Sequence, residues 1–89
     1  MLTVARIKSL TRPGMHADRD GLYLNITKRG SKSWILRYQL SGRRREMGLG
    51  SVRHVSLAEA REDTTGFLKL KSKGIDPKVY RDSRKQAIT

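Results

Sequence analysis

Three stretches in the middle of the chain alternate apolar and polar side chains, as strands with one buried face do. They run over residues 22–27, 33–40 and 43–49, and short polar connections that contain Gly30 and Gly42 separate them. The apolar face of the second stretch consists of Trp34, Leu36, Tyr38 and Leu40. Together the three stretches predict an antiparallel meander with one apolar face and one polar face.

The segment 57–73 predicts a helix that covers the apolar face of this sheet. Ser56 and Glu59 have the spacing of a capping box, in which each side chain binds the backbone amide of the other residue. Apolar or small side chains recur at helical spacing, at Leu57, Ala60, Thr64, Phe67 and Leu68. Gly74 supplies a left-handed stop. Gly66 costs the helix about 1 kcal/mol relative to Ala, so we expect it to mark a close approach to the sheet.

The two ends of the chain carry weaker patterns. Thr3 is placed to cap a short helical turn over residues 3–10, and residues 11–19 read as a loop. We expect one domain over residues 1–77 and a polar linker or tail over residues 78–89. The predicted fold class is therefore α+β: a three-stranded antiparallel β-sheet with one α-helix packed on one face, and a short amino-terminal helical turn.

Composition limits the kinds of protein that this chain can be. Its 89 residues hold 20 Lys and Arg against 8 Asp and Glu, for a net charge of +12 and a pI of about 11.0. A chain of this length supports a modest core and no deep enclosed pocket. The absence of Cys excludes disulfides and thiolate metal sites, and no apolar run reaches membrane-spanning length. We expect a small intracellular domain that meets a polyanion, with nucleic acid as the leading candidate.

The positive charge is concentrated where the strands are predicted. Residues 21–55 hold eight basic side chains and one acidic side chain, and so carry +7 of the total of +12. The helical segment 56–74 holds four basic and three acidic side chains, and so carries only +1. This distribution indicates that the polar face of the sheet is the functional face.

A β-ribbon fits the major groove of B-DNA, and the side chains expected on the polar face suit that groove. Candidates for contacts to base edges are Tyr23, Asn25, Thr27, Arg37, Gln39 and Arg44. Candidates for phosphate contacts, at strand ends and turns, are Lys28, Arg29, Lys32, Arg43 and Arg45. A merely solvated sheet face is the competing interpretation, and the excess charge favours nucleic acid over it. Trp34 and Tyr38 could stack bases, but their pairing with Leu36 and Leu40 favours the core.

Catalytic and metal-binding chemistry finds little support in the sequence. His16 and His54 lie far apart without Cys partners, so we expect no metal site. Asp18 and Asp20 resemble a carboxylate pair, but a turn that enters the first predicted strand explains them more simply. We expect no cofactor and no catalytic residues.

A series of short motifs covers nearly the whole chain: Asp20-Gly21-Leu22-Tyr23-Leu24, Gly30-Ser31-Lys32-Ser33-Trp34, Arg37-Tyr38, Gly42-Arg43-Arg44-Arg45, Leu49-Gly50-Ser51, Ser56-Leu57-Ala58-Glu59-Ala60-Arg61 and Gly74-Ile75-Asp76-Pro77. In this order and at these spacings, they resemble the amino-terminal domain of prophage integrases of the P4-like tyrosine recombinase family. The chain departs from the family at Val52-Arg53, where a Tyr-Pro-like pair is usual. The departure adds one positive charge.

This resemblance implies an arm-type DNA-binding domain that grips duplex DNA flanking the recombination core. It also implies downstream domains of the same integrase that exchange strands through a tyrosine, contacts with other integrase protomers, no membrane, and a cytoplasmic, nucleoid-associated location in bacteria. His16 and Arg19 match the family's catalytic His-x-x-Arg motif, but they lie in a predicted loop. None of the three tyrosines, Tyr23, Tyr38 and Tyr80, is positioned to act as the nucleophile. We expect this chain to be non-catalytic.

Two other functions remain open on the sequence. The basic sheet could lie across the minor groove of double-stranded RNA, or it could meet an acidic protein partner as an adaptor. Competition between duplex DNA and duplex RNA separates the first alternative from DNA binding.

Overall fold

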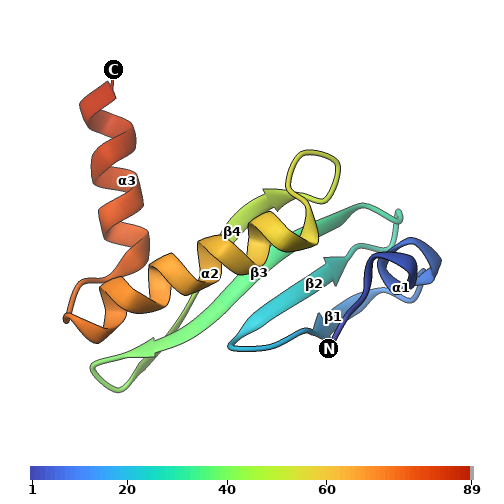
Figure 1. The fold of residues 1–89 in the computed structure, drawn as a ribbon, viewed down its shortest axis with the longest axis horizontal. Coiled ribbons are helices and arrows are strands. Elements are labelled where there is room, and N and C mark those ends of the chain that lie inside the picture. The colour runs from blue at the N-terminus through green and yellow to red at the C-terminus, as the bar shows by residue number, and fades with distance from the viewer. Residues whose placement is uncertain (89) are drawn as a thin grey trace.

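The structure, a computed structural model, describes residues 1–88, with side chains as far as residue 83. Its elements, in chain order, are α1 (Val4–Ser9), β1 (Gly14–Ala17), β2 (Leu22–Ile26), β3 (Lys32–Leu40), β4 (Arg43–Ser51), α2 (Leu57–Ser72) and α3 (Pro77–Ile88) (Figure 1). The predicted α+β class is confirmed. The described residues nevertheless form four strands and three helices, where three strands, one helix and a helical turn were expected.

The additional strand is β1, in a segment that was expected to be a loop. The strand order is β1-β2-β3-β4, and each neighbouring pair is antiparallel. β1 pairs with four of the five residues of β2, from Gly14 opposite Ile26 to Ala17 opposite Tyr23. Its four residues are too few to display an alternating pattern in the sequence, so only the pairing with β2 defines this strand.

The hairpin of β3 and β4 extends beyond the other two strands. Pairing between β2 and β3 ends at Leu22 opposite Leu36, whereas β3 and β4 stay paired as far as Leu40 opposite Arg43. We call residues 37–46 the ribbon, because they form a two-stranded extension of the sheet. At the other end of the hairpin a bulge shifts the register between Trp34 and its neighbour Ile35.

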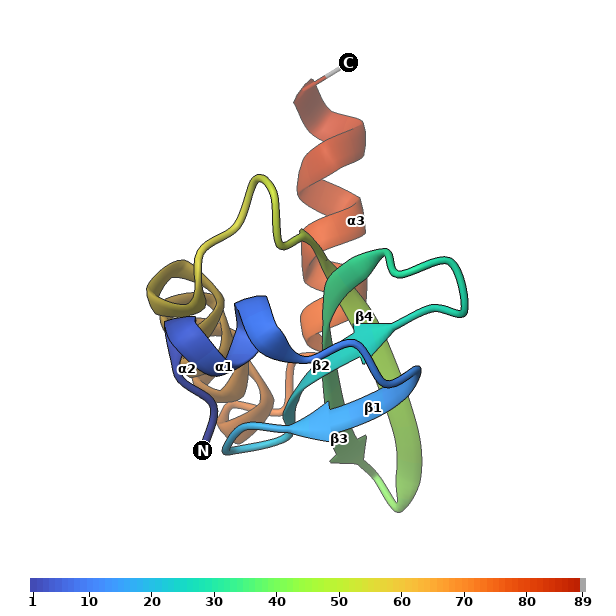
Figure 2. The same ribbon diagram turned by 90° about the vertical axis from the view of Figure 1, so that its right-hand side faces the viewer.

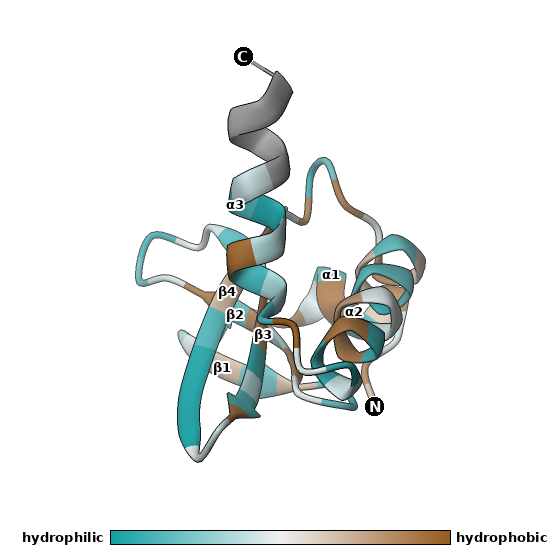
Figure 3. Ribbon diagram, turned by 90° about the vertical axis from the view of Figure 1, so that its left-hand side faces the viewer, coloured by the Kyte–Doolittle hydropathy of each residue, from teal (hydrophilic) through white to brown (hydrophobic). Residues whose placement is uncertain are grey.

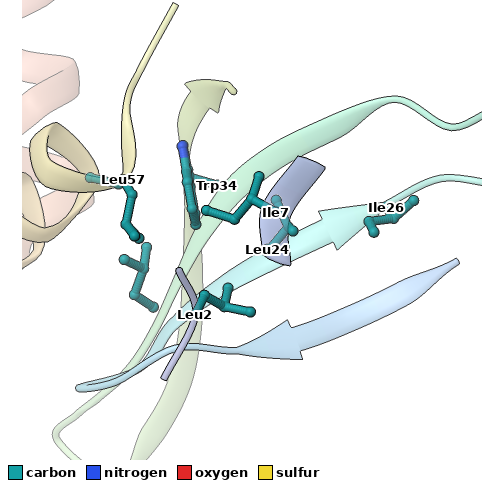
Figure 4. Packing of buried hydrophobic residues seen from close by; sticks show 8 residues of the cluster. Leu2, Ile7, Leu24, Ile26, Trp34 and Leu57 are labelled. Atoms are coloured by element: carbon teal, nitrogen blue, oxygen red, sulfur yellow. The ribbon is translucent and has the colours of Figure 1, made fainter. Parts of the chain in front are cut away.

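The helices α1 and α2 pack on the same face of the sheet (Figure 2), and the core lies between them and the strands. The main cluster of buried side chains consists of Leu2, Ile7, Leu22, Leu24, Ile26, Trp34, Leu57 and Ala60 (Figure 4). A second cluster lies at the base of the ribbon and consists of Leu36, Tyr38 and Met47, with Phe67 packed against it. The assignment of Trp34 and Tyr38 to the core is confirmed, and the Trp34 indole also donates a hydrogen bond of 2.8 Å to the Val55 carbonyl.

Helix α2 begins as the sequence predicts. The Ser56 hydroxyl accepts from the Glu59 amide at 3.1 Å, and the Glu59 carboxylate accepts from the Ser56 amide at 3.3 Å. The helix ends at Ser72, one residue before the predicted end, with Lys73 as its cap. The interpretation of Gly66 is wrong, because a Cβ added at this residue would have no atom within 4 Å. Gly66 lies on the exposed side of α2, away from the sheet.

Asp18 does more than make a turn. Its buried carboxylate accepts from the Arg61 guanidinium at 2.9 and 3.0 Å and from the Leu2 amide at 2.8 Å, which ties the start of the chain to α2. Burial alone would raise the pKa of Asp18, but these hydrogen bonds and the charge of Arg61 outweigh burial and lower it.

Helix α3 occupies the segment that was expected to be a polar linker, and it leads away from the rest of the domain (Figures 1 and 3). Asp76 accepts from the Lys78 amide at 3.0 Å with its carboxylate, and Pro77 takes the first helical position, where a missing amide hydrogen costs nothing. The Arg81 side chain donates to the Gly48 carbonyl of β4. The base of α3 is thus fixed to the sheet.

Candidate nucleic-acid interface

The sheet has one face that neither α1 nor α2 covers, and we call it the outer face. The register places Tyr23 opposite Ile35, Asn25 opposite Ser33, Arg37 opposite Glu46, and Gln39 opposite Arg44 on this face. Figure 3 shows that β4 is hydrophilic over most of its length. Five of the six predicted base-contact residues therefore share one face: Tyr23, Asn25, Arg37, Gln39 and Arg44.

Thr27, the sixth, lies in the turn that follows β2 rather than on the outer face. Its hydroxyl accepts from the Ser31 amide at 3.1 Å, and its own amide donates to the Ser31 carbonyl at 2.9 Å. These contacts close the turn between β2 and β3. The Thr27 side chain thus stabilises the turn that carries Lys28 and Arg29.

Arg37 occupies the middle of the outer face and has two neighbours. Its Nε donates to Glu46 Oε2 at 2.9 Å, and its guanidinium carbon lies 5.0 Å from the centroid of the Tyr23 ring. The side chains of Arg37 and Glu46 are about half exposed, at 50% and 59%. The sequence-based site did not include Glu46. Glu46 is the one acidic residue among the many basic residues of segment 21–55, and this isolation was the feature of the sequence that could have singled it out.

Arg45 points to the other face of the ribbon. It lies opposite Tyr38 in the register, and its Nη1 is 2.7 Å from Asp76 Oδ2, while the Tyr38 hydroxyl donates to Asp76 Oδ1 at 2.6 Å. Burial and this hydrogen bond raise the pKa of Tyr38 to about 12. Burial would also raise the pKa of Asp76, but the bonds from Tyr38 and the Lys78 amide, with the charge of Arg45, lower it. We call Tyr38, Arg45 and Asp76 the junction, because they join the ribbon to the base of α3.

The other predicted phosphate-contact residues divide into two groups. Lys32 Nζ donates to the carbonyls of Ile7 at 2.6 Å and Lys8 at 3.4 Å, so that this charge caps the carboxyl end of α1. The remaining residues are exposed, and their side chains form no ion pair or hydrogen bond within the described part of the chain: Lys28, Arg29 and Arg43.

A residue that the sequence-based site did not include, Arg53, belongs with this second group. The turn after β2 and the loop after β4 border a hollow of about 440 Å³, which is lined by Arg29, Gly30, Ser31, Lys32, Ser51, Val52 and Arg53. Among these described lining residues there are three cations and no acid. The signal in the sequence was the extra charge at Val52-Arg53, where the family pattern differs.

The described side chains offer no site for a metal ion. Among them there is no group of three or more His, Cys, Asp or Glu residues able to hold a metal ion. His16 Nε2 is instead 2.8 Å from the Arg12 carbonyl. Within residues 1–88, no helix has the length and hydropathy to span a membrane.

An antiparallel sheet with a basic, largely uncovered face and helices behind it has a shape that can fit a groove of DNA. The family model described as "Arm DNA-binding domain" matches residues 2–84. The chain therefore belongs to the Arm DNA-binding domain family, a family of DNA-binding domains. The resemblance inferred from the sequence is confirmed.

Three relatives are integrases. The chain is 38% identical over 80 residues to the integrase of Shigella phage Sf6. It is also 38% identical over 80 residues to the prophage integrase IntS of Escherichia coli (strain K12). Each match covers 86% of this chain and 21% of the relative. The integrase of Enterobacteria phage P4 is 40% identical over 65 residues, which is 71% of this chain and 15% of the relative. The matched region thus spans about a fifth of the length of the first two relatives.

Proposed function

We propose that the outer face recognises arm-type sites in duplex DNA, and that the chain serves as the arm-binding module of a phage or prophage integrase in site-specific recombination. The observation that carries this proposal is the gathering of Tyr23, Asn25, Arg37, Gln39 and Arg44 on one uncovered face of a sheet. Arginine and the side-chain amides form paired hydrogen bonds with guanine and adenine edges in the major groove.

The exposed cations around this face have a different role in the proposal. Lys28 and Arg29 on one turn, Arg43 at the end of the ribbon and Arg53 beside the hollow bind phosphates, which positions the protein without reading sequence. Lys32 and Arg45 bind groups of the domain itself, and their charge stabilises α1 and the junction. This division revises the phosphate set that the sequence predicted.

The relatives supply the remainder of the proposal. Because this chain matches about a fifth of each of two integrases, we assign strand exchange to regions outside the match and DNA recognition to the residues described here. The non-catalytic role, the contacts with other domains and protomers, and the cytoplasmic, nucleoid-associated setting belong to this proposal.

Selection from a short randomised duplex DNA library tests the proposal. The chain should enrich one duplex, bind it more tightly than a scrambled duplex, and prefer it to duplex RNA of the same sequence. If about six phosphates are neutralised, the logarithm of affinity should fall against the logarithm of salt with a slope of about −5. Failure to enrich any duplex, or equal binding of RNA, would contradict sequence recognition in DNA.

A further inference from the structure

The way in which Arg37 is held bears on which base the outer face reads. Its contact with Glu46 uses Nε, at 2.9 Å. Neither Nη1 nor Nη2 has a hydrogen-bond partner among the described residues. The two nitrogens that form the open end of the guanidinium fork are therefore available to a ligand.

Tyr23 restricts the same guanidinium from a second direction. The guanidinium carbon lies 5.0 Å from the centre of the Tyr23 ring, within the range of a cation–π contact. Tyr23 is on β2 and Glu46 on β4, so the two contacts come from the strands on either side of Arg37. A long, half-exposed side chain is thereby limited to a small range of orientations, which reduces the entropy lost when it binds.

Glu46 is otherwise difficult to explain. An exposed ion pair adds little stability, and a carboxylate on a face that meets DNA repels phosphates. Glu46 lies directly opposite Arg37 in the register, and this position is explained if the role of Glu46 is to orient the Arg37 side chain.

We propose that Arg37 is preset to read a guanine in the major groove, with Glu46 and Tyr23 as its positioning residues. Guanine presents two acceptors there, O6 and N7, at the spacing of an arginine fork. Adenine and cytosine each present an amino group that would face an Nη donor, so the preset fork rejects them. This inference rests on the proposed function and names the base that the outer face recognises.

The first test removes the charge of Glu46 and nearly preserves its shape, by Glu46→Gln in the full chain. Affinity for the enriched duplex should fall, because Arg37 is no longer held, while affinity for a scrambled duplex should rise, because one repulsive charge is gone. The ratio of the two affinities should fall about tenfold. The control is Glu62→Gln on the exposed surface of α2, which should leave that ratio unchanged.

The opposite signs distinguish a positioning role from two simpler ones. If Glu46 acts only through its charge, both affinities will rise together in Glu46→Gln, and if it only supports the fold, both will fall together. Either outcome overturns the proposal. Circular dichroism of the variant confirms that the domain is folded.

The second test identifies the base. Each guanine of the enriched duplex is replaced in turn by 7-deazaguanine, which lacks the N7 acceptor. One replacement should weaken wild-type binding about tenfold and weaken binding by Arg37→Lys much less, since lysine keeps the charge but lacks the fork. If no replacement shows this dependence on Arg37, the guanine assignment fails. If no duplex is enriched by the wild-type chain, it is the proposed function that fails.

Discussion

Asp18 stabilises the fold through contacts to residues far away in the sequence, although its neighbours in the sequence indicated only a turn. Its carboxylate is fully buried and holds both the Leu2 amide and Arg61. Its lowered pKa means that the folded state favours the ionised form. Asp18 therefore contributes stability above the pKa of the unfolded state, near pH 4, and loses it as the pH falls through the folded value.

We predict that Asp18→Asn costs about 2 kcal/mol at neutral pH, because the hydrogen bonds to a charged acceptor are weakened. The cost should shrink as the pH falls below about 4, because the carboxyl of the unfolded chain then takes up a proton that the folded carboxylate, with its lowered pKa, still resists. Urea unfolding at a series of pH values measures both effects. The exposed Asp20→Asn serves as the control, and an equal cost at all pH values would contradict the argument.

Tyr38 makes the opposite contribution at high pH. Its pKa is raised to about 12, so the stability that its protonated hydroxyl contributes is complete below about pH 10 and is lost as the pH rises toward the folded value. In the same unfolding series, Tyr38→Phe should remove this alkaline loss.

At the residue scale, the sequence predicted which side chains lie on the outer face. It did not predict which side chains bind other groups of the domain. Alternation along β2 and β3 correctly placed Tyr23, Asn25, Arg37 and Gln39. The same alternation puts Arg45 on the face of Met47, two residues further on, although its position near a turn had indicated a phosphate contact. Its partner Asp76 lies far along the chain, and no local pattern reveals such a pairing.

Among the elements, α2 offers a direct test of backbone energetics. A Cβ at Gly66 would meet no atom within 4 Å, so Gly66→Ala should stabilise the domain by about 1 kcal/mol and raise its Tm by about 4–8 °C. Thermal unfolding followed by circular dichroism measures the change.

The matched variant is Gly21→Ala at the turn between β1 and β2. Gly21 has a φ of +85°, and an added Cβ would lie 2.2 Å from the Arg37 carbonyl oxygen. This variant should be strongly destabilised. If the two alanines had similar effects, the assignment of Gly66 to open solvent would be wrong.

Element prediction succeeded where a pattern was long and failed where it was short or ambiguous. The strands β2, β3 and β4 and the helix α2 each have enough residues for a periodic signal. β1 has only four residues, and its pairing with β2 is what makes it a strand. The segment of α3 was expected to be a polar linker, although Asp76 followed by Pro77 is a start signal of a helix.

At the scale of the whole molecule, the phosphate-binding part of the proposal predicts a measurable change in salt dependence. Arg53→Gln should weaken binding to the enriched duplex and to a scrambled one alike, and should reduce the salt slope by about 1. Lys69→Gln, an exposed charge on α2, should leave the slope unchanged. Fluorescence titration across salt concentrations measures both variants. A change of sequence preference in Arg53→Gln would instead mean that this residue reads bases.

The junction has a geometric consequence for any protein in which this domain is one part. Tyr38, Arg45 and Asp76 fix the base of α3 to the ribbon, so α3 forms a rigid extension of about 18 Å. If the outer face binds DNA as proposed, the direction of α3 rotates about the DNA axis as the bound groove does. B-DNA completes a turn in about 10.5 base pairs. Moving the bound site by about five base pairs would therefore aim α3 at the opposite side of the duplex.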